Sequence, residues 1–330
     1  MTMREEYTIF HLSDTHFNGE NLDLLSLALN NLVEIAPRYV LFTGDVVESP
    51  KYNPRPFVRM IRSALARVGE KTGRQPVFLV IPGNHDFFWM GAYGVRKVRR
   101  FYQAFREEER SFFFSAEDQV AIAPFDSNRV IEPRGGFRRR LLQRIRYKSH
   151  GLIIEKDLDE FSQQVKQLRK SGDARAFERS LKIALIHHHV LPTSYSYLPA
   201  LADESYMMLE NAGVFIYRLV QEDFDLILHG HRHYPQFCRA AYYDPQGKEK
   251  VISILGCGSS GKPYDQWIAS AGHNFNVIRV HRDGTVTAVQ YFKFGTGDFV
   301  PAERVITLKT PKREEKTFEH EPGGWFGPQF

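Results

Sequence analysis

Short apolar runs alternate with amphipathic stretches in the first quarter of the chain. Apolar runs at residues 7–12, 39–42 and 77–81 have the length and composition of buried strands. Between them, residues 22–35 and 56–68 place apolar side chains at helical spacing. This order of strands and helices predicts βαβ units and a sheet that is at least partly parallel.

The same signals continue less regularly towards the C-terminus. They predict helices at residues 95–106, 157–169 and 204–220. They predict strands at residues 112–114, 120–125, 181–186, 224–228, 237–243, 251–255, 274–281 and 285–294. Gly247 and Asp283-Gly284 indicate hairpin turns, so the chain is expected to end as antiparallel sheet. No strong linker is visible, so we predict one domain, residues 1–308, and a loosely held tail, residues 309–330.

Composition places the chain among globular proteins. It has 330 residues, 42% of them hydrophobic, which is enough for a sizeable core. No apolar run approaches the roughly 18 residues that span a bilayer, and the charged start does not resemble a signal peptide. Cys238 and Cys257 lack metal-ligand spacing, which favours two buried, reduced thiols. We therefore expect a cytoplasmic protein.

Positive charge is concentrated in one segment. The net charge of the chain is +5, but residues 129–148 alone hold eight Lys or Arg and a single acid, Glu132. The rest of the chain is therefore slightly acidic. We treat residues 129–150 as a basic insertion and expect it to attract an anionic substrate. Its candidate substrate contacts are Arg138, Arg139 and Arg140.

Ligand-type side chains directly follow five of the predicted strands. They are Asp14, His16, Asp45, Asn84, His187, His231 and His233. The carboxyl ends of parallel strands gather at one edge of a sheet, where α/β proteins bind their ligands. Nitrogen and oxygen donors without a thiolate suit divalent Mn, Fe, Co, Ni or Zn. Seven donors suffice for two ions that share a carboxylate, an arrangement that can activate a nucleophile against a phosphoester.

These residues stand in five sequence blocks: Asp14-Thr15-His16, Gly44-Asp45 with Glu48, Gly83-Asn84-His85-Asp86, His187, and Gly230-His231-Arg232-His233. Together and in this order they resemble the signature of calcineurin-like metallophosphoesterases. The chain is most similar to the bacterial phosphodiesterases of the cyclic-nucleotide type. The resemblance implies an α/β fold, a four-layer αββα sandwich of two mixed β-sheets flanked by helices. It also implies a phosphoester hydrolase with a metal-bridging hydroxide nucleophile.

The resemblance also implies a role for each residue. The first ion is bound by Asp14, His16 and His233, the second by Asn84, His187 and His231, and Asp45 bridges them. His85 faces the leaving-group oxygen as proton donor or charge stabiliser, and Asp86 orients His85. Two divalent ions are required, of which we expect Mn to support activity. Glu48 is expected to lie behind the ligands.

Two assignments near the site stay open. Three consecutive histidines leave the register of the fourth block uncertain, and we choose His187 because it directly follows the apolar strand, with His188 as the alternative. The glycine-rich residues 256–262 lack the spacing of a Walker motif. We expect them to form a rim loop near the metals, from which Lys262 or Ser259 contacts the substrate phosphate.

The substrate is expected to be a small anionic phosphodiester, such as a nucleotide. A DNA nuclease is an alternative because of the basic segment, but that segment lacks the interleaved aromatics of a single-strand binding surface. A second alternative, a pyrophosphatase acting on a lipid-linked nucleotide sugar at the membrane surface, is suggested by Phe87-Phe88-Trp89-Met90. A non-enzymatic binding module is the least favoured. The oligomeric state stays open.

Overall fold

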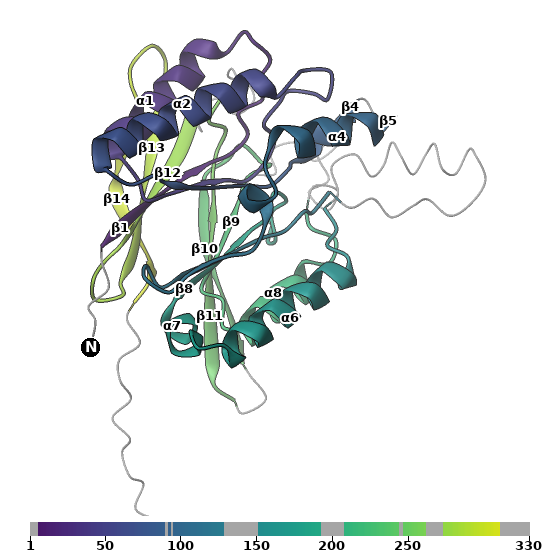
Figure 1. Cartoon of the computed structure of the whole chain (residues 1–330), viewed down its shortest axis with the longest axis vertical. Coiled ribbons are helices and arrows are strands. Elements are labelled where there is room, and N and C mark those ends of the chain that lie inside the picture. The colour runs from purple at the N-terminus through teal and green to yellow at the C-terminus, as the bar shows by residue number, and fades with distance from the viewer. Residues whose placement is uncertain are drawn as a thin grey trace, which may run out of the picture.

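Two six-stranded β-sheets pack face to face at the centre of the protein (Figure 1). The computed structural model describes residues 6–89, 92–93, 95–128, 151–192, 208–243, 247–261 and 273–310. The strand order is β14-β13-β12-β1-β2-β3 in the first sheet and β10-β11-β9-β8-β7-β6 in the second. Both sheets contain parallel and antiparallel pairs, so both are mixed.

The element bounds follow the predicted pattern closely. The first sheet comprises β1 (Tyr7–Leu12), β2 (Tyr39–Phe42), β3 (Val77–Val80), β12 (His273–Val280), β13 (Val286–Lys293) and β14 (Val300–Lys309). The second comprises β6 (Phe113–Ser115), β7 (Val120–Pro124), β8 (Leu181–Leu185), β9 (Leu226–His229), β10 (Gln236–Tyr243) and β11 (Glu249–Gly256). A small hairpin joins β4 (Phe88–Trp89) to β5 (Ala92–Tyr93).

Helices cover the outer face of each sheet. On the first lie α1 (Leu22–Ile35), α2 (Arg55–Thr72) and α4 (Val95–Ala104). On the second lie α6 (Glu155–Lys170), α7 (Ala174–Arg179) and α8 (Ala212–Gln221). The short α3 (Asn84–Phe87) and the 3-10 turn η1 (Glu108–Arg110) complete the described helices. The predicted αββα sandwich is confirmed.

Strand periodicity explains the layers. Successive side chains of a strand point to opposite faces. In β1, Ile9 therefore joins the core between the two sheets, whereas Phe10 and Leu12 pack under the helices. In β8, Ile183 faces the other sheet and Ala184 faces the helices. Because both faces are buried, the strands appear in the sequence as continuous apolar runs.

Several expectations differ from the structure. The predicted helix at 204–220 begins only at Ala212 within the described residues, after a turn in which Asn211 hydrogen-bonds the backbone of Ile153. The strand predicted at 112–114 is shifted by one residue. β14 was not predicted because half of its side chains are exposed and only Ile306 and Leu308 are buried, so it lacks a continuous apolar run. The basic segment 129–148 and most of the tail, 311–330, lie outside the described residues.

Among the described helices none is long and apolar enough to span a membrane.

The core between the sheets gives a direct stability test. Ile183 is fully buried there, so Ile183→Ala should lower the free energy of unfolding by about 2–5 kcal/mol. Val214→Ala on α8 is the control, because that side chain is 56% exposed and should contribute little. Urea denaturation followed by circular dichroism measures both. Equal losses in the two variants would contradict the assigned core.

Candidate metal centre

The loops after β1 and β2 run side by side and bring the first ligand candidates together. The amides of Asp14 and His16 donate to the carbonyls of Gly44 and Asp45 at 2.9 and 3.0 Å. The parallel pairing of the two strands thus continues into the loops. This backbone ladder fixes the separation of Asp14, His16 and Asp45.

The cluster concentrates unusual backbone conformations. Eight non-glycine residues of the described chain have positive φ, and five of them are ligand candidates: Asp14, His16, Asp45, His231 and His233. Such conformations cost about 1–3 kcal/mol each and persist only where surrounding contacts enforce them. Their accumulation at one place is typical of a functional site.

Two glycines let the backbone approach the carboxylates closely. A Cβ on Gly83 would lie 2.1 Å from Asp45 Oδ1. A Cβ on Gly230 would lie 1.8 Å from Ser13 Oγ and 2.3 Å from Asp14 Oδ2. All three distances are shorter than real Cβ contacts, so these two positions need glycine.

The first group of donors consists of Asp14, His16, Asp45 and His233, whose ligand atoms lie within 4.8 Å of one another. His233 Nε2 is 3.3 Å from Asp14 Oδ1 and 2.8 Å from His16 Nε2. His16 Nε2 is 3.8 Å from both Asp14 Oδ1 and Asp45 Oδ2. Ligands around one ion with bonds near 2.1 Å are separated by comparable distances.

The second group consists of Asp45, His187 and His231. His187 Nε2 lies 3.3 Å from Asp45 Oδ2, 3.0 Å from Asn84 Oδ1 and 3.2 Å from His231 Nδ1. The four predicted ligands of the second ion therefore face one another. Asp45 Oδ2 belongs to both groups.

The hydrogen bonds of His187 show that this donor set fits a cation. His187 Nδ1 donates to the carbonyl oxygen of Thr43 at 2.7 Å. In the neutral ring, Nε2 then presents a lone pair to Asn84 Oδ1 and Asp45 Oδ2, which also present lone pairs. A bound cation relieves this mutual repulsion and satisfies all three buried atoms.

The electrostatics of the buried cluster also favour positive charge. Burial acts to lower the pKa of His187, but the Asp45 carboxylate overrides burial and raises this pKa to about 9. Burial acts to raise the pKa of Asp45, but His187 and His85 lower it well below its usual range. Asp45 is thus held as a carboxylate among groups that need a cation.

His85 is held by backbone groups next to the first donor group. Its amide donates to Asp45 Oδ1 at 2.7 Å, and its Nδ1 donates to the carbonyl oxygen of Glu48 at 2.7 Å. Its ring packs edge-on against that of His16 at 4.7 Å. The Glu48 carboxylate lies 3.5 Å from His16 Nδ1. Glu48 thus contacts both histidines, and its backbone role gave no signal in the sequence.

Asp86 contacts the backbone rather than the ring it was expected to orient. Its carboxylate accepts from the amides of Gly83, Val46 and Val47 at 2.8, 3.3 and 3.2 Å. Burial, together with the charge of Asp45, raises the pKa of Asp86 to about 7. Because neighbouring side chains on a helical turn point about 100° apart, Asp86 and His85 diverge within α3. The Glu48 carbonyl, rather than Asp86, accepts the hydrogen bond from the His85 ring.

The three consecutive histidines have different environments. His187 lies in the second donor group, whereas His188 Nδ1 bonds Ser127 Oγ at 2.7 Å. His189 is fully buried, and burial, with a contribution from His229, lowers its pKa to about 3. His187 is therefore the one placed to bind the second ion.

The glycine-rich loop supports the first ligand loop from behind. Ser259 Oγ donates to the Asp14 carbonyl oxygen at 2.8 Å, and the Ser260 amide donates to that of Ser13 at 3.0 Å. The predicted substrate contacts lie outside the described residues: Arg138, Arg139, Arg140 and Lys262.

Comparisons with known proteins agree with the fold and identify a family. The family model for calcineurin-like phosphoesterases matches residues 7–235. A crystal structure of a dimetal phosphatase from Danio rerio aligns with a TM-score of 0.54 at 12% identity, over 92% of this chain and 99% of that chain. A purple acid phosphatase from yellow lupin seeds aligns with a TM-score of 0.48 at 12% identity, over 92% and 54%. A search of curated proteins gave no match.

The sandwich and its buried donor cluster define a metallophosphoesterase. Since the family match spans well over half of the chain, the protein belongs to the calcineurin-like phosphoesterase family. The family match and the donor cluster together support a metal-dependent phosphoric ester hydrolase.

Asp45→Asn should weaken the binding of both ions. The variant replaces the one carboxylate that the two donor groups share. Loss of a contact that supports a ligand lowers metal affinity roughly 10- to 100-fold. Loss of the ligand itself should lower metal affinity by more than this. Metal content after dialysis measures the loss. Asp118→Asn is the control, because this buried carboxylate bonds Tyr39 and Arg38 instead. Two retained ions in Asp45→Asn would contradict the shared-ligand assignment.

Proposed function

We propose that the protein is a phosphodiesterase that uses two divalent ions, most readily Mn, to hydrolyse a small anionic diester of the nucleotide type. The observation that carries this proposal is the position of Asp45 Oδ2, which lies 3.3 Å from His187 Nε2 and 3.8 Å from His16 Nε2. One carboxylate oxygen is thereby available to two neighbouring cation sites.

In this proposal the ligands divide as the two donor groups do. Asp14, His16 and His233 hold the first ion, Asn84, His187 and His231 hold the second, and Asp45 is shared. When bound, the two ions supply a water-derived nucleophile at neutral pH and neutralise the phosphoryl oxygens.

His85 serves as the proton donor to the leaving group. Its Nδ1–H is engaged by the Glu48 carbonyl, so Nε2 is the ring atom left to face a substrate. The amide contact with Asp45 ties this ring to the shared ligand. Asp86 supports the proposal indirectly. Its carboxylate accepts from the amide of Val46, next to Asp45, and from the amide of Gly83, two residues before His85.

The surroundings of the basic insertion support an anionic substrate. Its flanking residues, Asn128 and Gly151, both belong to the described chain and lie near the second donor group. A Cβ on Gly151 would lie 2.4 Å from His188 Cγ, and the His188 ring lies 4.6 Å from that of His231. The insertion therefore leaves and rejoins the fold beside the proposed metal centre.

The membrane alternative loses part of its motivation. Phe87, the first residue of the aromatic run, is 2% exposed and packs against Phe101 and Tyr102. Core packing accounts for the position of Phe87.

We propose a cytoplasmic location on the basis of the two free cysteines, Cys238 and Cys257.

Hydrolysis of bis-p-nitrophenyl phosphate tests the reaction. We predict turnover with Mn, none after chelation, and recovery when Mn is restored. A parallel panel of p-nitrophenyl phosphate, cyclic AMP, DNA and a lipid pyrophosphate ranks the substrate classes. Full activity after exhaustive chelation would contradict the two-ion proposal.

His85→Ala should lower kcat about 10²- to 10⁴-fold for substrates with poor leaving groups, the usual contribution of a general acid. The loss should be smaller for p-nitrophenolate, which leaves without a proton. Metal content should stay near two ions. Equal losses for both kinds of leaving group would show that His85 acts through charge or ligand geometry.

Replacing Arg138, Arg139 and Arg140 with Glu should lower kcat/KM for anionic diesters without removing metal. A small diester carries about one charge, so its KM should respond weakly to salt. A nuclease would show a log–log salt slope of about −0.7 to −0.9 per phosphate contact. Initial rates at several KCl concentrations measure this.

The matched control reverses three exposed cations elsewhere, Lys170, Arg282 and Arg304, and changes the net charge equally. It should leave kcat/KM near the wild-type value. Metal-dependent DNA cleavage with tight DNA binding, both lost only in the Arg138–Arg140 variant, would favour the nuclease instead.

A further inference from the structure

His231 differs from His187, the other histidine of the second donor group, in how its ring is fixed. His187 Nδ1 is held by the Thr43 carbonyl, and His16 Nδ1 faces the Glu48 carboxylate. His231 Nδ1 faces the second donor group, but its Nε2 is buried and has no hydrogen-bond partner among the described residues. Histidine ligands are usually oriented by a hydrogen bond at the second nitrogen. Something else must therefore orient this ring.

The ring of His188 lies where it can orient the ring of His231. Its centroid lies 4.6 Å from that of His231, closer than those of His187 and His189 at 4.9 and 6.2 Å. On its other side the backbone of Gly151 leaves no room, because a Cβ there would lie 2.4 Å from His188 Cγ. His188 is thus a fully buried spacer between Gly151 and His231.

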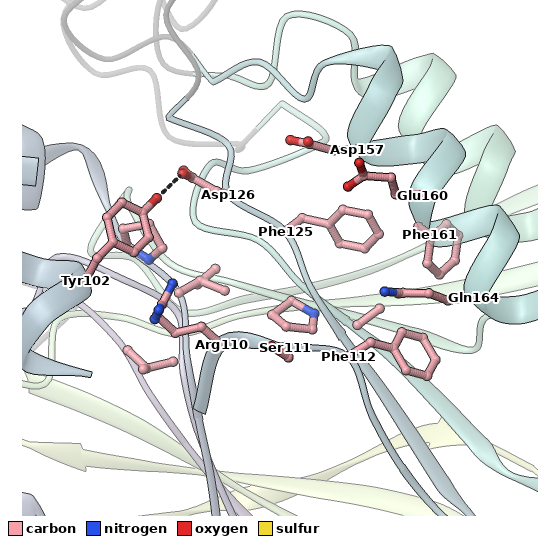
Figure 2. A pocket seen from close by; sticks show the side chains of 15 residues that line it. Tyr102, Arg110, Ser111, Phe112, Phe125, Asp126, Asp157, Glu160, Phe161 and Gln164 are labelled. Atoms are coloured by element: carbon pink, nitrogen blue, oxygen red, sulfur yellow. Dashed lines mark hydrogen bonds between the residues drawn. The ribbon is translucent and has the colours of Figure 1, made fainter. Parts of the chain in front are cut away.

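The anchor of His188 is itself fixed at several points. Ser127 Oγ bonds His188 Nδ1 at 2.7 Å, and the Ser127 carbonyl accepts from the Leu152 amide at 2.8 Å. On one side of Ser127, Asp126 accepts from the Tyr102 hydroxyl at 2.8 Å, as Figure 2 shows at the edge of a cavity of about 280 Å³. On the other side, the Asn128 side chain donates to the Pro82 carbonyl at 2.8 Å.

We propose that His188 is a positioning residue for the second metal ion, acting through ring contact with its ligand His231. The proposal rests on the two-ion function above. Ser127 holds the His188 ring, the ring limits the rotation of His231, and His231 Nδ1 stays directed at His187. His188 itself does not bind the ion.

Calorimetric titration of the metal-free full-length protein with Mn tests this proposal. His188→Ala should weaken the second binding event about 10- to 100-fold and leave the first at the wild-type level. His188→Phe keeps a ring between Gly151 and His231 and should restore most of the lost affinity. His188→Asn keeps a polar group near Ser127 but removes the ring, so it should resemble His188→Ala.

A second, independent variant acts from the opposite side. Gly151→Ala pushes the His188 ring towards His231 and should also weaken only the second ion. His281→Ala is the matched control, because this histidine bonds Thr287 beside the start of β1, at the far end of the first sheet. It should bind both ions as the wild type does.

The outcomes separate this proposal from the proposed function. If the wild type binds fewer than two ions, the two-ion function fails. If the wild type binds two and His188→Ala binds both equally well, His188 has no positioning role. If His188→Phe is as weak as His188→Ala, ring contact alone does not position His231, and the proposal is overturned.

Discussion

The architecture of the site depends on one buried carboxylate that needs positive charge. Asp45 is 1% exposed, and its Oδ2 is approached by nitrogens of two histidines from different sheets. A carboxylate this deeply buried is costly unless it is paired. Asp45 accordingly raises the pKa of His187 to about 9, so the site favours positive charge beside this carboxylate. Bound cations would supply that charge on both sides.

This requirement explains why the local backbone is strained. The ligands must point inwards from loops that have just left two different sheets. Positive φ at Asp14, His16 and Asp45, and again at His231 and His233, turns the chain sharply enough to do so. The cost is offset by the surrounding contacts, including the Asp86 clamp and the loop hydrogen bonds behind Asp14.

The sequence predicted those parts of the protein that follow from local pattern. Buried strands produce apolar runs, and polar residues at their carboxyl ends had to meet, so the seven ligand candidates lie together as expected. β14 was not predicted because only two side chains of this edge strand, Ile306 and Leu308, are buried. The start of α8 was misplaced because a turn fixed by a distant contact, Asn211 to Ile153, precedes it.

Other features of the site depend on contacts that no local pattern encodes. The Glu48 carbonyl that holds His85, and the Ser127 hydroxyl that holds His188, are neighbours only after the loops have folded together. Asp86 looked like a partner of His85 because the two are adjacent in sequence. On a helical turn, however, adjacent side chains point in different directions. This is the physical reason why Asp86 does not orient the His85 ring.

Anomalous X-ray diffraction from crystals grown with Mn tests the central claim most directly. The account predicts two anomalous peaks that share Asp45, one beside Asp14, His16 and His233 and the other beside Asn84, His187 and His231. A single peak, or two peaks of which neither contacts Asp45, would contradict it.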